Sequence, residues 1–155
     1  MATNLDLRKA LAHLLKDTSS HTVKAGILEG ATNSETGQNI AEYAAYNEYG
    51  TSTIPARPFM RTTIANHSEE WLKELAQALR VYPPKQALQF LGLRMRDAIV
   101  EQIASNMPPA NKPSTIRQKQ KQIVGKGLKG AGTMTPGTLI DTGSMINAVN
   151  YEVSK

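Results

Sequence analysis

Both ends of this chain carry a short run of alternating residues, and this alternation most constrains the possible fold. Near the start, Val23, Ala25 and Ile27 alternate with other residues, which predicts a strand over about His21–Leu28. Near the end, the same spacing predicts a strand over Val149–Val153. We expect the first and last strands to pair antiparallel in a small sheet. The predicted class is α+β: about three helices packed on a small antiparallel sheet, in a single domain of 155 residues.

Before the first strand and between the two strands, apolar residues recur every three or four positions, as in helices packed on one side. Helices are predicted at Leu5–Lys16, from a cap at Asn39 to Tyr49, at Ser68–Leu79 or from just after Pro58, and at Lys85–Asn106. In the third of these, Trp71, Leu72, Leu75, Ala76 and Leu79 form the expected apolar stripe. Short turns of Gly, Pro and Asn separate the segments.

Composition excludes several classes of protein. The chain has no cysteine, which excludes a disulfide framework, a thiolate metal site and a cysteine nucleophile. No apolar run is long enough to cross a bilayer, and the first residues lack the pattern of a signal peptide. The three histidines have no second ligand at metal spacing, so we expect neither a metal nor a cofactor.

Basic residues are concentrated late in the chain. Residues 1–101 hold 11 basic and 11 acidic residues, whereas the rest holds 7 and 2. Residues 108–137 are rich in Pro, Gly and Lys and contain no acid, so we expect a long, flexible, basic loop, in which only Ser114–Val124 suits a short helix. Its cations either form a solvated surface or dock on an acidic partner or on DNA phosphates: Lys112, Arg117, Lys119, Lys121, Lys126 and Lys129.

A rigid turn follows the second predicted helix. Gly50 suits the end of that helix, and Pro55 and Pro58 stiffen the segment up to Phe59. Glu48 and Arg57 flank the turn, which predicts either a local surface salt bridge or an arginine presented to a neighbouring subunit. We therefore predict subunit or partner contacts at Glu48, Arg57 and Phe59.

Two short motifs resemble catalytic signatures by their letters. Asp141-Thr142-Gly143 matches the nucleophile loop of aspartic proteases, but only twelve residues follow it, too few for the cleft. The preferred interpretation is a turn in which Asp141 or Thr142 caps a short helix up to Asn147. The glycine–lysine run over residues 125–130 matches a dinucleotide fingerprint without the required strand before it and helix after it. We expect no enzymatic activity.

Three groups of segments, taken in order, resemble the phage virion-morphogenesis family of tail-completion and neck proteins. The first is Val23-Lys24-Ala25-Gly26-Ile27-Leu28. The second is Ala44-Ala45-Tyr46-Asn47-Glu48-Tyr49-Gly50, leading to Ile54-Pro55-Ala56-Arg57-Pro58-Phe59. The third is Pro113-Ser114-Thr115-Ile116 followed by Leu139-Ile140-Asp141-Thr142-Gly143 and the last strand. The stretch from Ile116 to Leu139 is longer and more basic than in the family, so its contacts transfer least.

The resemblance implies a structural virion protein of the neck or tail top of a long-tailed bacteriophage. Such a protein forms a homo-oligomeric ring that completes the tail and joins it to the head, and it has no catalytic residues or cofactor. Its partners are itself and the adjacent neck, connector or tail proteins, with DNA in the channel as another, and assembly takes place in the bacterial cytoplasm. A tail terminator, a nucleic-acid-binding module using the basic loop, and a dimeric aspartic-type hydrolase are the alternatives.

Overall fold

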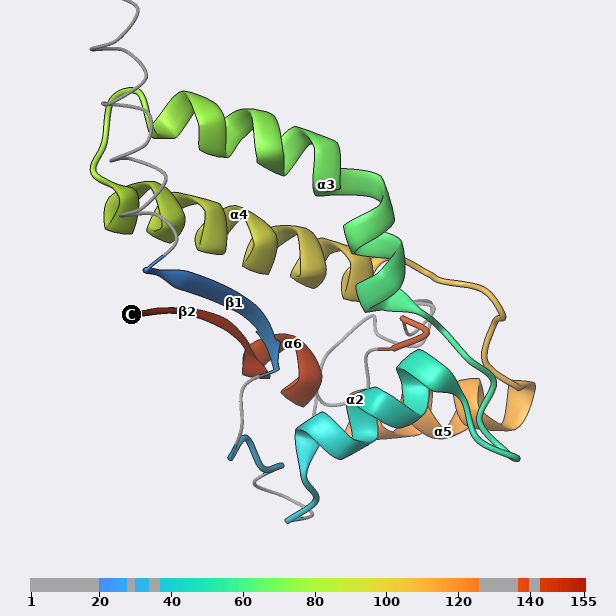
Figure 1. The fold of residues 1–155 in the computed structure, drawn as a ribbon. Helices are drawn as coiled ribbons and strands as arrows, with labels where there is room; N and C mark the ends of the chain where they lie inside the picture. Colours follow the sequence, from blue (N-terminus) through green and yellow to red (C-terminus); the bar gives the residue numbers. More distant parts are fainter. Residues whose placement is uncertain (1–19, 28–29, 34–36, 126–136, 140–142) are drawn as a thin grey trace, which may run out of the picture.

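The computed structural model describes residues 20–27, 30–33, 37–125, 137–139 and 143–155 (Figure 1). The predicted helix at Leu5–Lys16 lies outside these residues. The described elements are, in order, β1 (Thr22–Ile27), α2 (Ile40–Tyr49), α3 (Phe59–Ala78), α4 (Pro84–Ala104), α5 (Pro113–Gly125), α6 (Ser144–Ala148) and β2 (Val149–Ser154). Helices and a small sheet are combined, so the predicted α+β class is confirmed.

The sheet consists of β1 and β2 paired antiparallel, as predicted from the alternation at the two ends of the chain. Val23 lies opposite Val153, and Ile27 opposite Val149. Val149 is buried and Ile27 packs against the core. Charged residues occupy alternate positions, where Lys24 and Glu152 form an exposed ion pair of 3.6 Å.

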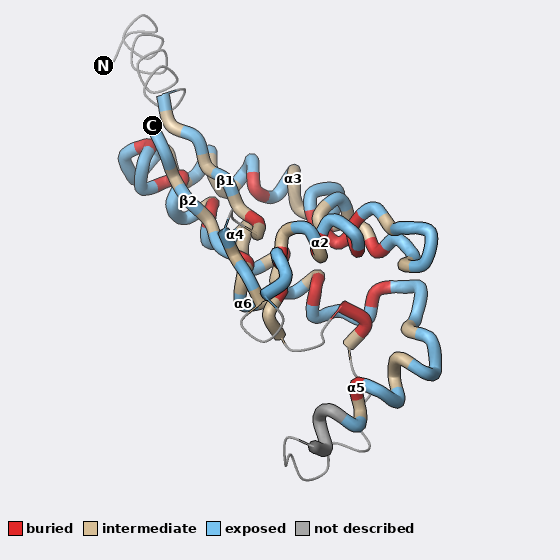
Figure 2. Tube along the Cα trace, turned by 90° about the horizontal axis from the view of Figure 1, so that it is seen from below, coloured by how far each residue is buried: buried red, intermediate tan, exposed pale blue. Residues whose placement is uncertain are grey.

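Helix α4 lies between α3 and the sheet (Figure 1). Its approach to the sheet is close because Gly92 has no side chain: a Cβ there would lie 2.3 Å from Cδ2 of Tyr151. Farther along α4, Ile99 and Ile103 are buried. The largest core cluster therefore gathers at the second half of α4, with residues from α2, the start of α3, α6 and β2 (Figure 2): Ile40, Ala44, Phe59, Ile99, Ile103, Met107, Leu139, Met145 and Val149.

Helix α3 begins directly after Pro58, which confirms the longer of the two predicted forms. Its expected apolar stripe is only partly buried: Trp71 is 8% exposed, but Leu72 is 68% exposed and Ala76 also faces solvent. The reason is that α3 packs mainly against one neighbour, α4, which covers a narrow strip of its surface.

Residues 108–137, predicted as a long flexible basic loop in which only Ser114–Val124 suits a helix, contain helix α5, which confirms the predicted short helix. The pattern is amphipathic. Thr115, Ile116 and Lys119 face the protein, whereas the exposed positions recur at helical spacing: Ser114, Arg117, Gln118 and Lys121. Residues 126–136 lie outside the described part of the chain, and with them Lys126 and Lys129.

Two helix caps were predicted, and they differ in outcome. The Asn39 side chain accepts hydrogen bonds from the backbone N–H groups of Ala41, at 2.9 Å, and Glu42, at 3.4 Å, which confirms the cap of α2. Helix α6 instead has Gly143 at its N-cap position, with φ of 79° and no side-chain hydrogen bond. The predicted capping residues Asp141 and Thr142 therefore do not occupy that position, and they lie outside the described residues.

Candidate functional site at the junction of helices α2 and α3

The connection from α2 to α3 is a tight turn that only glycine can begin. Gly50 has φ of 77°, in the region that L side chains rarely adopt. A Cβ there would also lie 2.9 Å from the backbone nitrogen of Ala56. The turn closes where Thr51 N donates to Ile54 O at 2.8 Å and Ile54 N donates to Thr51 Oγ1 at 3.0 Å. Pro55, beyond it, is exposed.

Glu48 supplies the N-terminal cap of α3. Pro58 occupies the N-cap position and makes no side-chain cap, so the first N–H groups of α3 need another acceptor. The buried Glu48 carboxylate accepts from Met60 N at 2.8 Å and from Arg61 N at 3.2 Å. A negative charge here is also favoured by the helix dipole.

The ion pair of Glu48 forms with Arg61, and the predicted pair with Arg57 is wrong. Arg61 Nε lies 2.9 Å from Glu48 Oε1, and its terminal nitrogen Nη2 donates to Glu48 O at 2.8 Å. The guanidinium also stands over the Tyr49 ring, 5.1 Å from its centre, and Tyr49 is 71% exposed. Arg61 therefore contacts both the buried Glu48 carboxylate and the exposed Tyr49 ring.

Arg57 points into the protein, which corrects the prediction that it is presented to a neighbouring subunit. It is 5% exposed, and it donates from Nε to Pro109 O at 3.0 Å and from Nη2 to Asn111 Oδ1 at 3.1 Å. Asn111 Nδ2 in turn donates to Thr138 O at 3.2 Å. Both acceptors of the guanidinium are neutral, and burial lowers the pKa of Arg57 from its ordinary value, partly opposed by Tyr43.

We call the set Asn47, Glu48, Arg57, Arg61 and Asn111 the junction network. Its fifth member, Asn47, accepts at its backbone oxygen from Arg57 N at 2.6 Å and donates from Nδ2 to Tyr43 O at 2.9 Å. Phe59, beside the network, is 1% exposed and belongs to the core, so its predicted partner contact is also wrong. The network connects parts of the chain up to 54 residues apart and positions α3 relative to the segment before α5.

The predicted basic residues divide into two groups. Lys112, Arg117 and Lys121 are exposed and face solvent. Lys119 is 9% exposed, and its Nζ donates to Gly137 O at 3.3 Å, so it holds α5 to the following segment. Of these four residues, Lys112, Arg117 and Lys121 therefore place their charge at the surface, and Lys119 does not.

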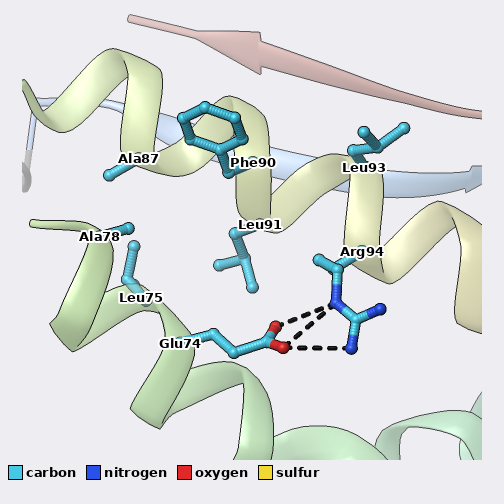
Figure 3. A pocket seen from close by; sticks show the side chains of 8 residues that line it. All are labelled: Glu74, Leu75, Ala78, Ala87, Phe90, Leu91, Leu93 and Arg94. Carbon is cyan, nitrogen blue, oxygen red and sulfur yellow. Dashed lines mark hydrogen bonds and ion pairs between the residues drawn. The ribbon is translucent and has the colours of Figure 1, made fainter. Parts of the chain in front are cut away.

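A second feature, a hollow between α3 and α4, has a volume of about 220 Å³ (Figure 3). Its lining is mostly apolar, with one charged pair at the edge where Glu74 lies 3.1 Å from Arg94. The Glu74 carboxylate raises the pKa of Arg94 by hydrogen bonding and charge, with Glu70 adding a smaller effect. The lining residues are Glu74, Leu75, Ala78, Ala87, Phe90, Leu91, Leu93 and Arg94.

The described residues contain no group of three or more metal-ligating side chains and no helix able to cross a membrane. Of the three histidines considered as metal ligands, His21 forms a hydrogen bond with Ser20, and the His67 ring stacks on the Trp71 ring with 5.7 Å between their centroids. His13 lies outside the described residues.

Sequence reasoning missed Asn47, Arg61 and Asn111 in the junction network. Arg61 could have been found, because it lies in the first turn of the longer predicted form of α3, and Glu48 precedes that helix. Asn111 could not have been found, because its partner is distant in sequence. Comparison of the chain with models of protein families, with curated proteins and with solved structures gave no match.

Proposed function

We propose that this protein is a structural subunit of the neck or tail top of a long-tailed phage, acting as a ring that completes the tail and joins it to the head. The proposal starts from the family resemblance of the segments at 23–28, 44–59, 113–116 and 139–143. Of these, residues 44–59 form the turn around which the junction network is built. A segment that fixes the arrangement of helices inside the subunit is compatible with a structural, assembly role.

The observation that carries the proposal is the sheet. It has two strands in the described part of the chain, so the outer edge of each has no strand beside it there. A two-stranded sheet is marginal alone, and an open edge is a template for pairing with another chain. Neighbouring copies pairing edge to edge, β1 of one against β2 of the next, give a heterologous contact, which generates a ring when the rotation between copies closes.

The test is electron microscopy of particles from a phage that lacks this protein. The joining role predicts separate filled heads and finished tails, and the normal gene supplied in trans restores complete virions. Tails of abnormal length would instead indicate a tail terminator. A map of the complete virion that shows a single copy, or copies not in contact, would contradict the ring.

A nucleic-acid-binding module is the second candidate, and the exposed face of α5 favours it. Arg117 and Lys121 lie on that face and Lys112 lies just before the helix. None of the three takes part in an ion pair within the described part of the chain. Three phosphate contacts predict a salt slope of about −3 for duplex DNA. Binding of the isolated monomer to DNA with that slope, lost in the triple glutamine variant, would favour this candidate over the ring.

A further inference from the structure

One face of α4 is open and apolar. Phe90 and Leu93 are 50% and 42% exposed, and Tyr82, just before the helix, is 42% exposed. Tyr82 and Phe90 are in ring contact, with centroids 4.9 Å apart. Phe90 and Leu93 line the hollow between α3 and α4 together with Leu75 and Ala78 (Figure 3). Tyr82 extends this apolar groove through its contact with Phe90. We call this surface the α4 groove.

The strand that begins the continuous fold, β1, lies along the helix that carries this groove. Gly92 of α4 lies against Tyr151 of β2, which pairs with Ala25 of β1. Farther along α4, Arg96 donates to Val149 O, and Val149 pairs with Ile27. β1 therefore runs in the same direction as α4, and its first residue lies near the first turns of that helix (Figure 1).

The residues before β1 have a surface that matches the α4 groove. Leu5–Lys16 has an apolar stripe at helical spacing and polar residues elsewhere, the pattern of a helix that packs on one side. As a helix, these residues span about 18 Å, shorter than α4 at about 31 Å. Residues 17–21 allow a linker of up to about 17 Å. The stripe is Leu7, Ala10, Leu11, Leu14 and Leu15.

We propose that residues 5–16 dock as an amphipathic helix in the α4 groove of their own chain. The apolar stripe covers Tyr82, Phe90 and Leu93, as in other complexes of a helix with a groove. Docking within one chain is favoured over docking on a second copy, because so short a linker gives an effective concentration on the order of millimolar. The inference is independent of the proposed ring.

Hydrogen exchange on the full chain tests this inference. We expect the amides of residues 5–16 to exchange at least about tenfold more slowly than in an unstructured peptide. The variant Phe90→Glu should abolish that protection. Leu72→Glu is the matched control, because Leu72 is 68% exposed on α3 and does not line the groove. Absence of protection in the natural chain, or its loss in both variants, overturns the inference.

A cross-linking experiment separates the chain's own segment from a second copy. The chain has no cysteine, so the pair Leu11→Cys and Leu93→Cys creates the only two thiols. Docking within one chain predicts a cross-linked monomer on a non-reducing gel, at a yield independent of protein concentration. A cross-linked dimer whose yield rises with concentration overturns docking within one chain and identifies a second copy as the occupant.

A substitution within residues 5–16 provides a second test if the Phe90→Glu variant does not fold. Leu11→Glu lies outside the described fold, and it should speed exchange at residues 82–93 severalfold without lowering protection in β1 and β2. Unchanged exchange at residues 82–93 would show that the segment does not cover the α4 groove.

Discussion

Two of the glutamate–arginine pairs formed by α3 differ in their surroundings. In the pair of Glu48 with Arg61, the carboxylate side chain is 6% exposed and also accepts backbone N–H groups of α3. In the pair of Glu74 with Arg94, the side chains are 34% and 55% exposed, and the carboxylate caps nothing. The nitrogen–oxygen distances are close, 2.9 and 3.1 Å. Loss of the Glu48 carboxylate leaves two partly buried N–H donors of α3 without an acceptor, whereas water can replace the exposed Glu74–Arg94 pair.

The largest loss of stability is expected at Arg57, a second buried member of the junction network. Arg57→Ala removes two hydrogen bonds of a buried cation and leaves Asn111 and the Pro109 carbonyl short of a donor. We expect the free energy of unfolding in urea to fall by about 3 kcal/mol. The loss in the free energy of unfolding should be smaller for Arg57→Lys, which keeps the positive charge without the planar guanidinium. A loss below about 0.5 kcal/mol, the range of an ordinary surface change, would refute the buried network.

The next effect is expected at Glu48. Glu48→Ala removes the cap of α3, and we expect a loss of about 2 kcal/mol in the free energy of unfolding. Glu48→Gln keeps one acceptor oxygen and should lose about half as much. Urea denaturation of the two variants measures the difference. Equal losses would show that charge, and not capping, is what Glu48 contributes.

The exposed pair should respond far less. Glu74→Gln and Arg94→Gln, alone or together, should leave the midpoint of urea unfolding unchanged within error, because both groups remain solvated in either state. In high salt, the variants should again share the unfolding midpoint of the natural chain, because salt screens the exposed pair. A clear drop in the midpoint would remove the contrast between the two pairs.

The smallest effect is expected from a contact inside one helix. The Tyr46 hydroxyl donates to Glu42 one turn earlier on α2, and this bond, with the Glu42 charge, raises the pKa of Tyr46 above its ordinary value. A raised pKa in the folded state means that the stabilisation is complete below about pH 10 and is lost as the pH rises through the folded value. Spectrophotometric titration should show a late tyrosine transition that Tyr46→Phe removes. An unchanged titration curve would contradict the bond.

Much of the fold follows from local patterns in the sequence. The alternation of Val23, Ala25 and Ile27 places them on one side of a strand whatever it packs against, because the period of a strand is two residues. The Asn39 cap is local too, since its donors are two and three residues away. The same holds for the short helix at Ser114–Val124, whose amphipathic spacing outweighed its loop-like composition.

The site depended on contacts that no local pattern contains. The sequence correctly marked residues 48–59 as a rigid turn, but it assigned Glu48 and Arg57 to each other because they are neighbours along the chain. Whether a charged side chain finds a carboxylate, a carbonyl or water depends on which distant segment lies beside it. Residues 57 and 111 are brought together by the packing of α2 and α3 against the chain that follows α4.

Local patterns along the chain were enough to predict the class of fold, the strand pairing, the Gly50 turn and the absence of thiol chemistry. They were not enough to predict that Arg57 and Phe59 are internal, that Glu48 caps α3, or that the described fold leaves Phe90 and Leu93 exposed on α4. The difference comes from the range of each effect. Backbone preference and side-chain periodicity act over a few residues, whereas burial is a property of the whole packed chain, and it decides how much each charge or apolar group contributes.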